Sequence, residues 1–263
     1  MSNEMDRPVA LVTGASKGVG RGVVLGLTEA GFRVCATGRS IDEADLPPAV
    51  RRVPCDHTDD EQTARVFETV EREYRRLDLL VNSSWGGYER MVEDGRFTWS
   101  APFWQQPLHR WHSMMDAGAR SAFVCSAHAA RLMIPRRKGM IVNISFWAAQ
   151  RRIGNVIYGV AKAATDKLTL DSAEELRPFG IAVISLYPGL VRTEAVLAAG
   201  SALNLSNSES PQFIGRVIAG LFDAPDALNQ SGKVIVAAEA AIRMGVTDID
   251  GSSPRPISLS DLP

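Results

Sequence analysis

The chain has 263 residues, of which 45% are hydrophobic and 22% charged, and its formal net charge is −1. This composition is ordinary for a globular protein with a substantial core. The near-neutral charge argues against nucleic acid or an acidic membrane surface as the main partner. No stretch approaches the ~20 apolar residues of a membrane helix, and the polar residues 1–7 do not predict a signal peptide. We therefore expect a cytoplasmic protein with no membrane partner.

Seven short apolar runs alternate with segments of helical periodicity along the chain. The runs are rich in Val and Ile and nearly continuous, which is typical of strands covered by helices on both faces. Their alternation predicts an α/β fold, a three-layer Rossmann-type doubly wound parallel sheet of about seven strands. No repeat or linker interrupts the pattern, so residues 1–263 are expected to form a single domain. The predicted strands are Val9–Val12, Arg33–Ala36, Arg52–Cys55, Leu79–Val81, Met140–Ile144, Ile181–Leu186 and Val234–Ala237, and the clearest helices are Thr63–Tyr74, Ser121–Met133 and Ala161–Leu176.

Two segments break this alternation. Trp85–Trp111 is rich in aromatic side chains and Glu194–Gln212 in Ala, Ser and Asn, and neither is predicted to contain a strand. Both follow strand ends, and ligands of such sheets bind beyond the carboxyl ends of the strands. We predict that they form two walls of a substrate pocket for an apolar or cyclic ligand, with Glu194–Gln212 acting as a lid.

A glycine-rich loop follows the first predicted strand and opens a helix that runs to Ala30. Glycines allow a tight turn and let the backbone approach a pyrophosphate, while the helix N-terminus supplies N–H groups and partial positive charge. A plain turn is the alternative, since any strand–helix junction can carry glycines. We predict a cofactor loop whose binding residues are Gly14, Ser16, Lys17, Gly18, Val19 and Gly20.

The end of the second predicted strand bears on the choice of cofactor. An NAD enzyme usually carries an acid here, which binds the ribose hydroxyls, but this chain has Gly38 followed by Arg39. A guanidinium binds a 2′-phosphate through two bonds at once, and Lys17 could reach the same phosphate. Two solvated surface cations are the alternative. The missing acid and the added base favour NADP(H) over NAD(H).

Asp56 ends the third predicted strand, and two roles are open to it. Its carboxylate could accept the adenine amino group of a dinucleotide. It could equally cap the helix that begins near Asp59, because Asp is a favoured N-cap residue. The chemistry of the residue alone does not separate these roles.

A serine, a tyrosine and a lysine form the candidate catalytic group. Tyr158 and Lys162 are four residues apart and so share one face of a helix, and Ser145 ends the preceding strand. A free tyrosine has a pKa of ~10, and an adjacent ammonium and a positive nicotinamide would favour its phenolate. Tyr158 would then exchange a proton with the substrate oxygen, which Ser145 would hold, while Lys162 would hold the nicotinamide ribose. For the Tyr–Lys pair alone, a chance spacing is the alternative.

Together these motifs resemble the short-chain dehydrogenase/reductase family over nearly the whole chain. The family's glycine motif and its catalytic serine, tyrosine and lysine fall on the residues named above. The resemblance implies hydride transfer between NADP(H) and a small carbonyl or alcohol, in a homodimer or homotetramer. It assigns Asp56 to the adenine, and Val191 and Thr193 to the nicotinamide carboxamide. The other cofactor-binding residues that it implies are Asn82, Pro188 and Gly189.

A narrower resemblance is to the group of dehydrogenase/reductase SDR family member one. That group is associated with NADPH-linked reduction of carbonyls, including steroid ketones. The segments that carry this resemblance are Phe103-Trp104, Ala130–Met133, Tyr158–Lys162 and Gly245–Gly251.

The chain departs from the family pattern at two positions. Trp85, in Asn82-Ser83-Ser84-Trp85, stands where the family has a glycine, which changes the expected path of the next loop. Gly118 stands where the family has an asparagine that holds a water between the lysine and solvent. Glycine leaves room for another water, so we expect an active reductase with proton supply through water near Lys162. The alternative is that Gly118 only lets two helices approach closely.

Two rival functions are less consistent with these residues. A non-catalytic NADP(H)-binding redox sensor or scaffold needs no Ser–Tyr–Lys trio, and a methyltransferase would want an acid at the end of the second strand. His109 and His112 could share a helix face, but no third metal ligand lies near them in sequence. The histidines are expected at the surface or in the core, and the cysteines, Cys35, Cys55 and Cys125, to pack as small hydrophobic residues.

Overall fold

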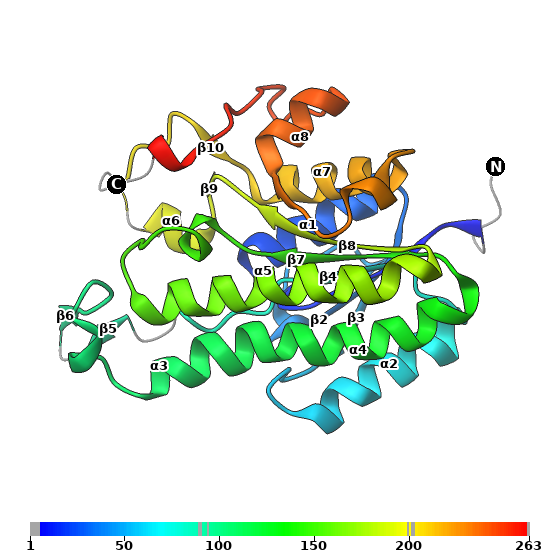
Figure 1. The fold of residues 1–263 in the computed structure, drawn as a ribbon, viewed down its shortest axis with the longest axis horizontal. Helices are drawn as coiled ribbons and strands as arrows, with labels where there is room; N and C mark the ends of the chain where they lie inside the picture. The colour runs from blue at the N-terminus through cyan, green and yellow to red at the C-terminus, as the bar shows by residue number, and fades with distance from the viewer. Residues whose placement is uncertain (1–5, 89–90, 94, 199, 201–202, 262–263) are drawn as a thin grey trace.

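A seven-stranded parallel sheet forms the centre of the computed structural model, which describes residues 6–88, 91–93, 95–198, 200 and 203–261 (Figure 1). The strand order is β11-β8-β7-β4-β1-β2-β3, and every pair is parallel. This confirms the predicted doubly wound α/β sheet. The strands are β1 (Val9–Val12), β2 (Arg33–Gly38), β3 (Arg51–Pro54), β4 (Leu79–Asn82), β7 (Gly139–Ile144), β8 (Ile181–Tyr187) and β11 (Val234–Val236).

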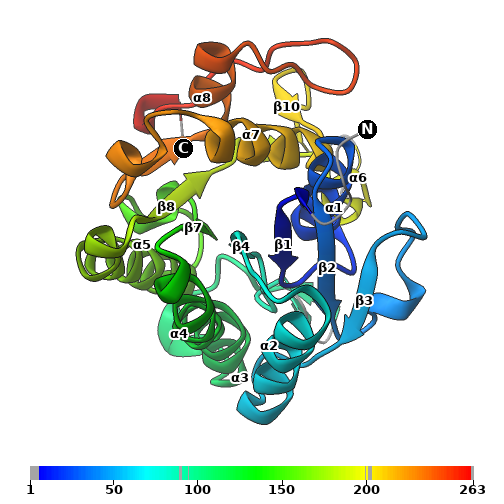
Figure 2. The ribbon, with the colours of Figure 1, turned by 90° about the vertical axis from the view of Figure 1, so that its right-hand side faces the viewer.

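Helices cover both faces of the sheet, as Figure 2 shows. One face carries α1 (Gly18–Glu29), α7 (Pro211–Asp223) and α8 (Ala237–Met244). The opposite face carries α2 (Asp60–Tyr74), α4 (Ser121–Met133) and α5 (Val156–Leu176). Two short helices, α3 (His109–Trp111) and α6 (Glu194–Ala198), lie in the segments that interrupt the alternation.

The first strand shows why its sequence is apolar at every position. Ala10 and Val12 belong to the core cluster under α1 and α7, whereas Val9 and Leu11 belong to the cluster under α2 and α4. All four side chains are fully buried. Burial of one Val or Leu side chain stabilises the fold by ~1.5–3 kcal/mol. In a strand covered on both faces, a polar side chain would therefore destabilise the fold at every position.

Two predictions about element boundaries were wrong. The segments expected to lack strands contain two-residue ones. In the first, β5 (Val92–Glu93) pairs with β6 (Arg96–Phe97), and in the second, β10 (Ser208–Glu209) pairs with β9 (Leu190–Val191), which lies just before that segment. Such bridges are too short to show alternation in a sequence. The helix α5 also begins five residues before the predicted Ala161. Its start is fixed by Asn155, whose Oδ1 accepts hydrogen bonds from the backbone N–H groups of Ile157 and Tyr158.

A stretch of π-helix, His112–Arg120, runs directly into α4. Such wide turns occur mostly as short insertions in α-helices, frequently at functional sites. Gly118 is buried in this stretch. The π-helix therefore places position 118 beside the end of the sheet where the candidate catalytic residues lie.

Candidate active site

The candidate site lies at the carboxyl edge of the sheet, where the strand order changes direction. The strands β2 and β4 flank β1 on opposite sides, so the loops after β1 and β4 diverge at this point. Thr13, at the end of β1, ties them together, because its Oγ1 accepts hydrogen bonds from Ser83 N (3.0 Å) and Ser84 N (3.1 Å). The glycine loop and the loop after β4 therefore form one wall.

Glycine is required at two turns of the loop after β1. Gly14 and Gly18 have φ angles of +64° and +61°, in the left-handed region that side chains disfavour. A Cβ at Gly14 would also lie 2.6 Å from the carbonyl oxygen of Ser83. The backbone is thus exposed at the N-terminus of α1, with Lys17 at the surface and Val19 packed against the core.

An acidic side chain occupies this N-terminus. Oε2 of Glu194 accepts a hydrogen bond of 2.9 Å from the Gly18 N–H, and Oε1 lies 3.6 Å from Arg21 Nη1. An anion is favoured there by the unpaired N–H groups and the helix dipole. The Gly18 N–H is thus an available donor for an anion at this end of α1.

The surroundings of Gly38 fit the ribose end of a dinucleotide. The Oγ of Ser16 is buried and has no hydrogen-bond partner among the residues that the structure describes, and a Cβ at Gly38 would collide with it. A buried hydroxyl without a partner is costly unless a ligand or water completes it. Arg39 is exposed next to this position, and its charge helps to lower the pKa of Asp56, which lies just after the neighbouring strand β3.

Asp56 does not cap α2, so that alternative was wrong. The N-cap is Asp59, whose Oδ1 accepts hydrogen bonds from the N–H groups of Glu61 and Gln62. The Asp56 carboxylate instead accepts from the N–H and hydroxyl of Thr58. Burial alone would raise the pKa of Asp56, but these bonds hold it below its usual value. The adenine role stays a prediction.

Asn82 is held inside the sheet edge. Its Nδ2 donates to Asn143 Oδ1 (2.8 Å) on β7 and to Ser126 Oγ (3.1 Å) on α4. Its Oδ1 is buried and finds no hydrogen-bond partner in the described part of the chain. The side chain therefore joins three elements and leaves only its oxygen available to a water or ligand.

The loop after β8 meets the glycine loop from the other side. Thr193 packs against Gly18, with its Cγ2 3.6 Å from the position of a Cβ there. The Gly189 N–H, just after the buried Pro188, donates to Glu209 Oε2 at 2.8 Å. Glu209, which sequence reasoning did not single out, is almost fully buried, and burial raises its pKa to about 7. Val191 pairs with it in the β9–β10 bridge.

The predicted serine, tyrosine and lysine come together beside this wall. Ser145 follows β7 and its Oγ lies 3.4 Å from the carbonyl oxygen of Lys162. Lys162 Nζ donates to the carbonyl oxygen of Ile144 (3.0 Å) and lies 5.9 Å from the centre of the Tyr158 ring. All three side chains are buried, with exposed fractions of 2% for Ser145, 5% for Tyr158 and 8% for Lys162.

Burial dominates the ionisation of the tyrosine and the lysine. It raises the pKa of Tyr158 well above 10, helped by the neighbouring Tyr88 hydroxyl, with which Tyr158 shares a hydrogen bond. The predicted lowering of this pKa is therefore absent in the protein alone, because the ring is desolvated and the ammonium points toward Ile144. Burial also lowers the pKa of Lys162 to about 8, against the opposing charge of Asp166.

Aromatic side chains of the interrupting segment enclose Tyr158. The ring centres of Trp85, Tyr88 and Trp99 lie 5.6, 6.4 and 5.3 Å from that of Tyr158. Phe146 adds a fourth ring at 6.3 Å. The sequence marked this segment by its composition, but it could not show which rings contact Tyr158.

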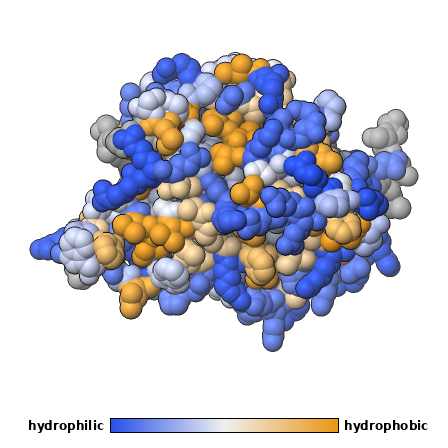
Figure 3. Space-filling view, viewed as in Figure 1, coloured by the Kyte–Doolittle hydropathy of each residue, from blue (hydrophilic) through white to orange (hydrophobic). Residues whose placement is uncertain are grey.

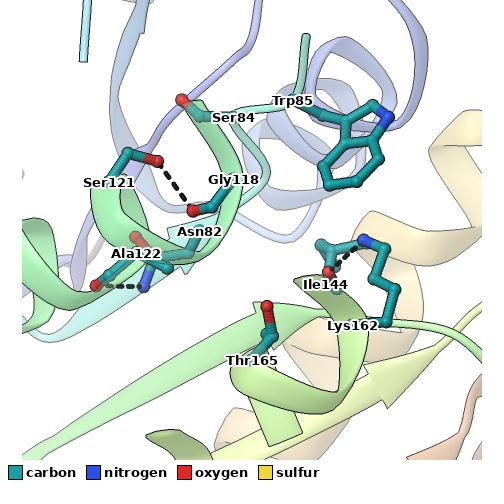
Figure 4. A pocket seen from close by; sticks show the side chains of 9 residues that line it. All are labelled: Asn82, Ser84, Trp85, Gly118, Ser121, Ala122, Ile144, Lys162 and Thr165. Carbon is teal, nitrogen blue, oxygen red and sulfur yellow. Dashed lines mark hydrogen bonds between the residues drawn. The ribbon is translucent and has the colours of Figure 1, made fainter. Parts of the chain in front are cut away.

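A small cavity of about 10 Å³ lies beneath Trp85 (Figure 4). That volume is close to the minimum for one water molecule. Ser121 Oγ donates at 3.0 Å to the carbonyl oxygen of Gly118 on one side of it. The cavity is lined by Asn82, Ser84, Trp85, Gly118, Ser121, Ala122, Ile144, Lys162 and Thr165.

The histidines and cysteines do not assemble a metal site within the described part of the chain, where no group of three or more His, Cys, Asp or Glu side chains is placed to hold a metal ion. All three cysteines are free and buried, and all belong to the core cluster under α2 and α4, as predicted. His57 lies in the same region, with its ring 3.6 Å from Cys55 Sγ and 3.5 Å from Cys125 Sγ.

Comparison with known proteins identifies the family. The model for short chain dehydrogenase matches residues 8–203, so the chain belongs to the short-chain dehydrogenase/reductase family. Within it, the mouse protein Dehydrogenase/reductase SDR family member 1 is 39% identical over 94% of this chain and 85% of its own length. The human protein of the same name is 36% identical over 95% of this chain and 86% of its own length. Both resemblances inferred from the motifs are confirmed. The chain is thus an oxidoreductase of a family that acts on CH–OH or C=O groups with a nicotinamide cofactor.

Solved structures share the fold. The ElxO variant with NADPH bound has a TM-score of 0.75 at 20% identity, covering 88% of this chain and 97% of that one. The NADPH dependent reductase YwfH, involved in bacilysin biosynthesis, has a TM-score of 0.72 at 20% identity, covering 88% and 96%. In the described residues, no helix combines the length and apolarity needed to cross a membrane.

Proposed function

We propose that the protein is an NADP(H)-dependent reductase that converts a small apolar or cyclic carbonyl compound to an alcohol. The observation that carries the proposal is the meeting of Ser145, Tyr158 and Lys162 beside the anion-binding N-terminus of α1. Ser145 precedes Tyr158 by 13 residues, and Tyr158 precedes Lys162 by four. All three are buried at one edge of the sheet. A protein that only binds a nucleotide has no need of this arrangement.

The cofactor would lie along the loops after β1, β2 and β8. The N–H groups of Gly14, Gly18 and the first turn of α1 would take its pyrophosphate in place of Glu194. The residues suited to its 2′-phosphate are Ser16, Lys17 and Arg39, because they offer an unpartnered hydroxyl and two exposed cations. Asp56 would accept the adenine amino group, and Lys162 would donate to the nicotinamide ribose. This choice of cofactor is supported by the NADPH bound in the ElxO structure and by the description of YwfH as an NADPH dependent reductase.

The ionisation of Tyr158 favours reduction as the direction of the reaction. When bound, the reduced cofactor would supply a hydride for the carbonyl carbon. Ser145 donates a hydrogen bond to the carbonyl oxygen, and Tyr158 gives that oxygen its proton as charge develops there. Because burial keeps the phenol protonated, the side chain is ready to act as the acid. The ammonium of Lys162 stabilises the phenolate that remains.

The apolar character of the substrate is inferred from the side chains around Tyr158. The site is closed by Trp85, Tyr88 and Trp99, and apolar side chains continue onto the surface at the end of the molecule that carries β5, β6 and α3 (Figure 3). Large apolar residues exposed in this segment are Phe97, Phe103, Trp104, Leu108 and Trp111. Flat or aliphatic carbonyl compounds bury such surface favourably. A cytoplasmic homo-oligomer of single-domain subunits completes the proposal.

The test is an NADPH-oxidation screen over aldehydes, ketones, diketones, quinones and steroids, followed by Tyr158→Phe on the best substrate. Loss of the proton donor should lower kcat by at least ~10²-fold. NADPH affinity, measured by cofactor fluorescence, should stay within about threefold, since the hydroxyl does not hold the cofactor. Tyr74→Phe, which removes a hydroxyl on α2 far from the site, is the matched control. Turnover retained in Tyr158→Phe would refute the mechanism, and an enzyme inactive on every class would favour the nucleotide-binding alternative.

A further inference from the structure

Trp85 and Gly118 are packed against each other across the candidate site. A Cβ at position 118 would lie 2.9 Å from both Cε3 and Cζ3 of the Trp85 ring, closer than real side chains approach. Gly118 belongs to the π-helix and Trp85 to the loop after β4, 33 positions earlier in the chain. The ring can therefore occupy its place only because residue 118 has no side chain, so the two departures from the family pattern are one structural change.

The ammonium of Lys162 also lies against the Trp85 ring. Its Nζ lies over the ring, 4.4 Å from the ring centre, within the range of a cation–π contact. Nζ also donates a hydrogen bond to the carbonyl oxygen of Ile144 at 3.0 Å and lies 5.9 Å from the centre of the Tyr158 ring. Figure 4 shows Trp85 and Lys162 on the same side of the small cavity, with Gly118 facing them. The negative face of an indole stabilises a buried cation, and this stabilisation is largest when water is excluded.

We propose that Trp85, seated on Gly118, is a positioning residue that holds the Lys162 ammonium in place and in its charged form. The other reading is that the indole only fills space. That reading does not account for a charged nitrogen, rather than a methyl or methylene group, lying over the ring. The role in turnover rests on the proposed function, whereas the contact with Lys162 does not.

The first test measures the lysine without turnover. The chain has five lysines, so a protein labelled with ¹³C at lysine Cε should give five NMR signals, of which Lys162 is identified by its loss in Lys162→Arg. Trp85→Leu keeps an apolar side chain but removes the π face, so the pKa of Lys162 should fall by about one unit. Trp85→Phe keeps a weaker π face and should lower it less. Phe123→Leu, which removes an exposed ring on α4, is the matched control and should not move it.

An unchanged Lys162 pKa in Trp85→Leu would overturn the proposal. A raised pKa would overturn it as well, because the ring would then act only by keeping water away from the ammonium. If Trp85→Leu fails to fold, as judged by its thermal transition, the comparison of Trp85→Phe with the natural protein decides the question in the same way. These measurements need no substrate. A shifted pKa in a protein without reductase activity would therefore count against the proposed function alone.

The second test asks whether positions 85 and 118 act as a pair. Gly118→Asn should displace the indole and Trp85→Gly should remove it, and each should lower kcat roughly tenfold. The double variant has room for the asparagine and should recover at least about fivefold over the poorer single variant. Losses that multiply in the double variant, with the fold intact, would show that the two positions are independent and would overturn the pairing.

Discussion

Burial of individual side chains sets the chemistry of the site more than their charges do. Tyr158 is desolvated by four rings, so its proton is held more firmly than in water. The same burial makes Lys162 easier to deprotonate, with a pKa of about 8. At neutral pH the pair is therefore a phenol beside an ammonium, the state from which a proton can be given to a reduced carbonyl. Alcohol oxidation needs the phenolate instead, and so depends on the positive charge of the oxidised cofactor.

The proposed preference for NADP(H) can be tested at Arg39. Arg39→Asp replaces an exposed guanidinium at the end of β2 with the acid typical of NAD enzymes. NADPH affinity should fall roughly ten- to a hundredfold, the loss of one charge-assisted bond of ~1.5–3 kcal/mol, while NADH affinity should be kept or improved. Binding of both cofactors is measured by fluorescence titration at fixed salt. Arg243→Asp, the same change at an exposed position on α8, is the control. Equal affinities of the natural protein for NADH and NADPH would already refute the idea.

Single residues of the candidate site can be predicted from the sequence where one helix or one loop fixes the distance between them. The glycine loop and the Tyr158–Lys162 pair could be predicted because a turn and a helix impose their distances. The contact of Trp85 with Gly118 could not, since it depends on how the loop after β4 packs against the π-helix. Asp56 was ambiguous for a related reason: Asp59 has the same capping chemistry, and only the backbone shows which of the two precedes α2.

Among the elements, the buried strands were the most predictable. Each was located from an apolar run, and β1 and its neighbours end within two residues of the prediction. Continuous burial leaves a strong pattern, whereas the β9–β10 bridge depends on residues 18 positions apart and leaves none. The start of α5 was placed five residues too late because its first turn carries exposed as well as buried apolar side chains, and so shows no clear helical period. Its cap, Asn155, was visible in the sequence.

The short helix α6 is expected to respond to cofactor. Its first residue, Glu194, accepts the Gly18 N–H at the site proposed for the pyrophosphate, so under the proposed function NADPH would displace this carboxylate. Glu194→Gln should tighten NADPH binding about two- to fivefold, because an anion at a helix N-terminus contributes ~0.3–1 kcal/mol. Glu175→Gln, at an exposed position on α5, should have no effect.

Hydrogen exchange gives the second readout for α6. In the natural protein, the amides of Thr193–Ala198 should change their protection when NADPH binds and gain further protection with substrate, as a lid would. Unchanged NADPH affinity in Glu194→Gln, together with unchanged exchange in this segment, would show that the carboxylate does not compete with the cofactor.

For the molecule as a whole, two buried groups give stability opposite dependences on pH. Glu209 has its pKa raised to about 7, so the folded state binds its proton more tightly and stability falls as pH rises from 4.5 to 7. His57 has its pKa lowered by burial to about 4. There the unfolded chain binds the proton more tightly, and stability falls as pH drops from about 6.5 to 4. Over much of the acidic range the two effects partly cancel, and the pH profile of the natural protein conceals both.

Removal of the histidine should reveal its contribution. The His57 ring lies between β2 and the helices α2 and α4, with Nε2 2.7 Å from Thr37 Oγ1 and Nδ1 3.3 Å from Thr63 Oγ1. At pH 7.5, His57→Gln should unfold with a free energy lower by ~1–3 kcal/mol, since it disturbs these buried bonds. The gap should narrow by about 2 kcal/mol by pH 5, because only the natural protein must keep a neutral imidazole in the core. Urea unfolding at a series of pH values measures the free energy of unfolding of the natural protein and of His57→Gln. Glu209 contributes equally to both proteins, so its effect cancels in their difference. Parallel curves between pH 7.5 and 5 would mean that His57 is protonated in the folded protein as readily as in the unfolded chain.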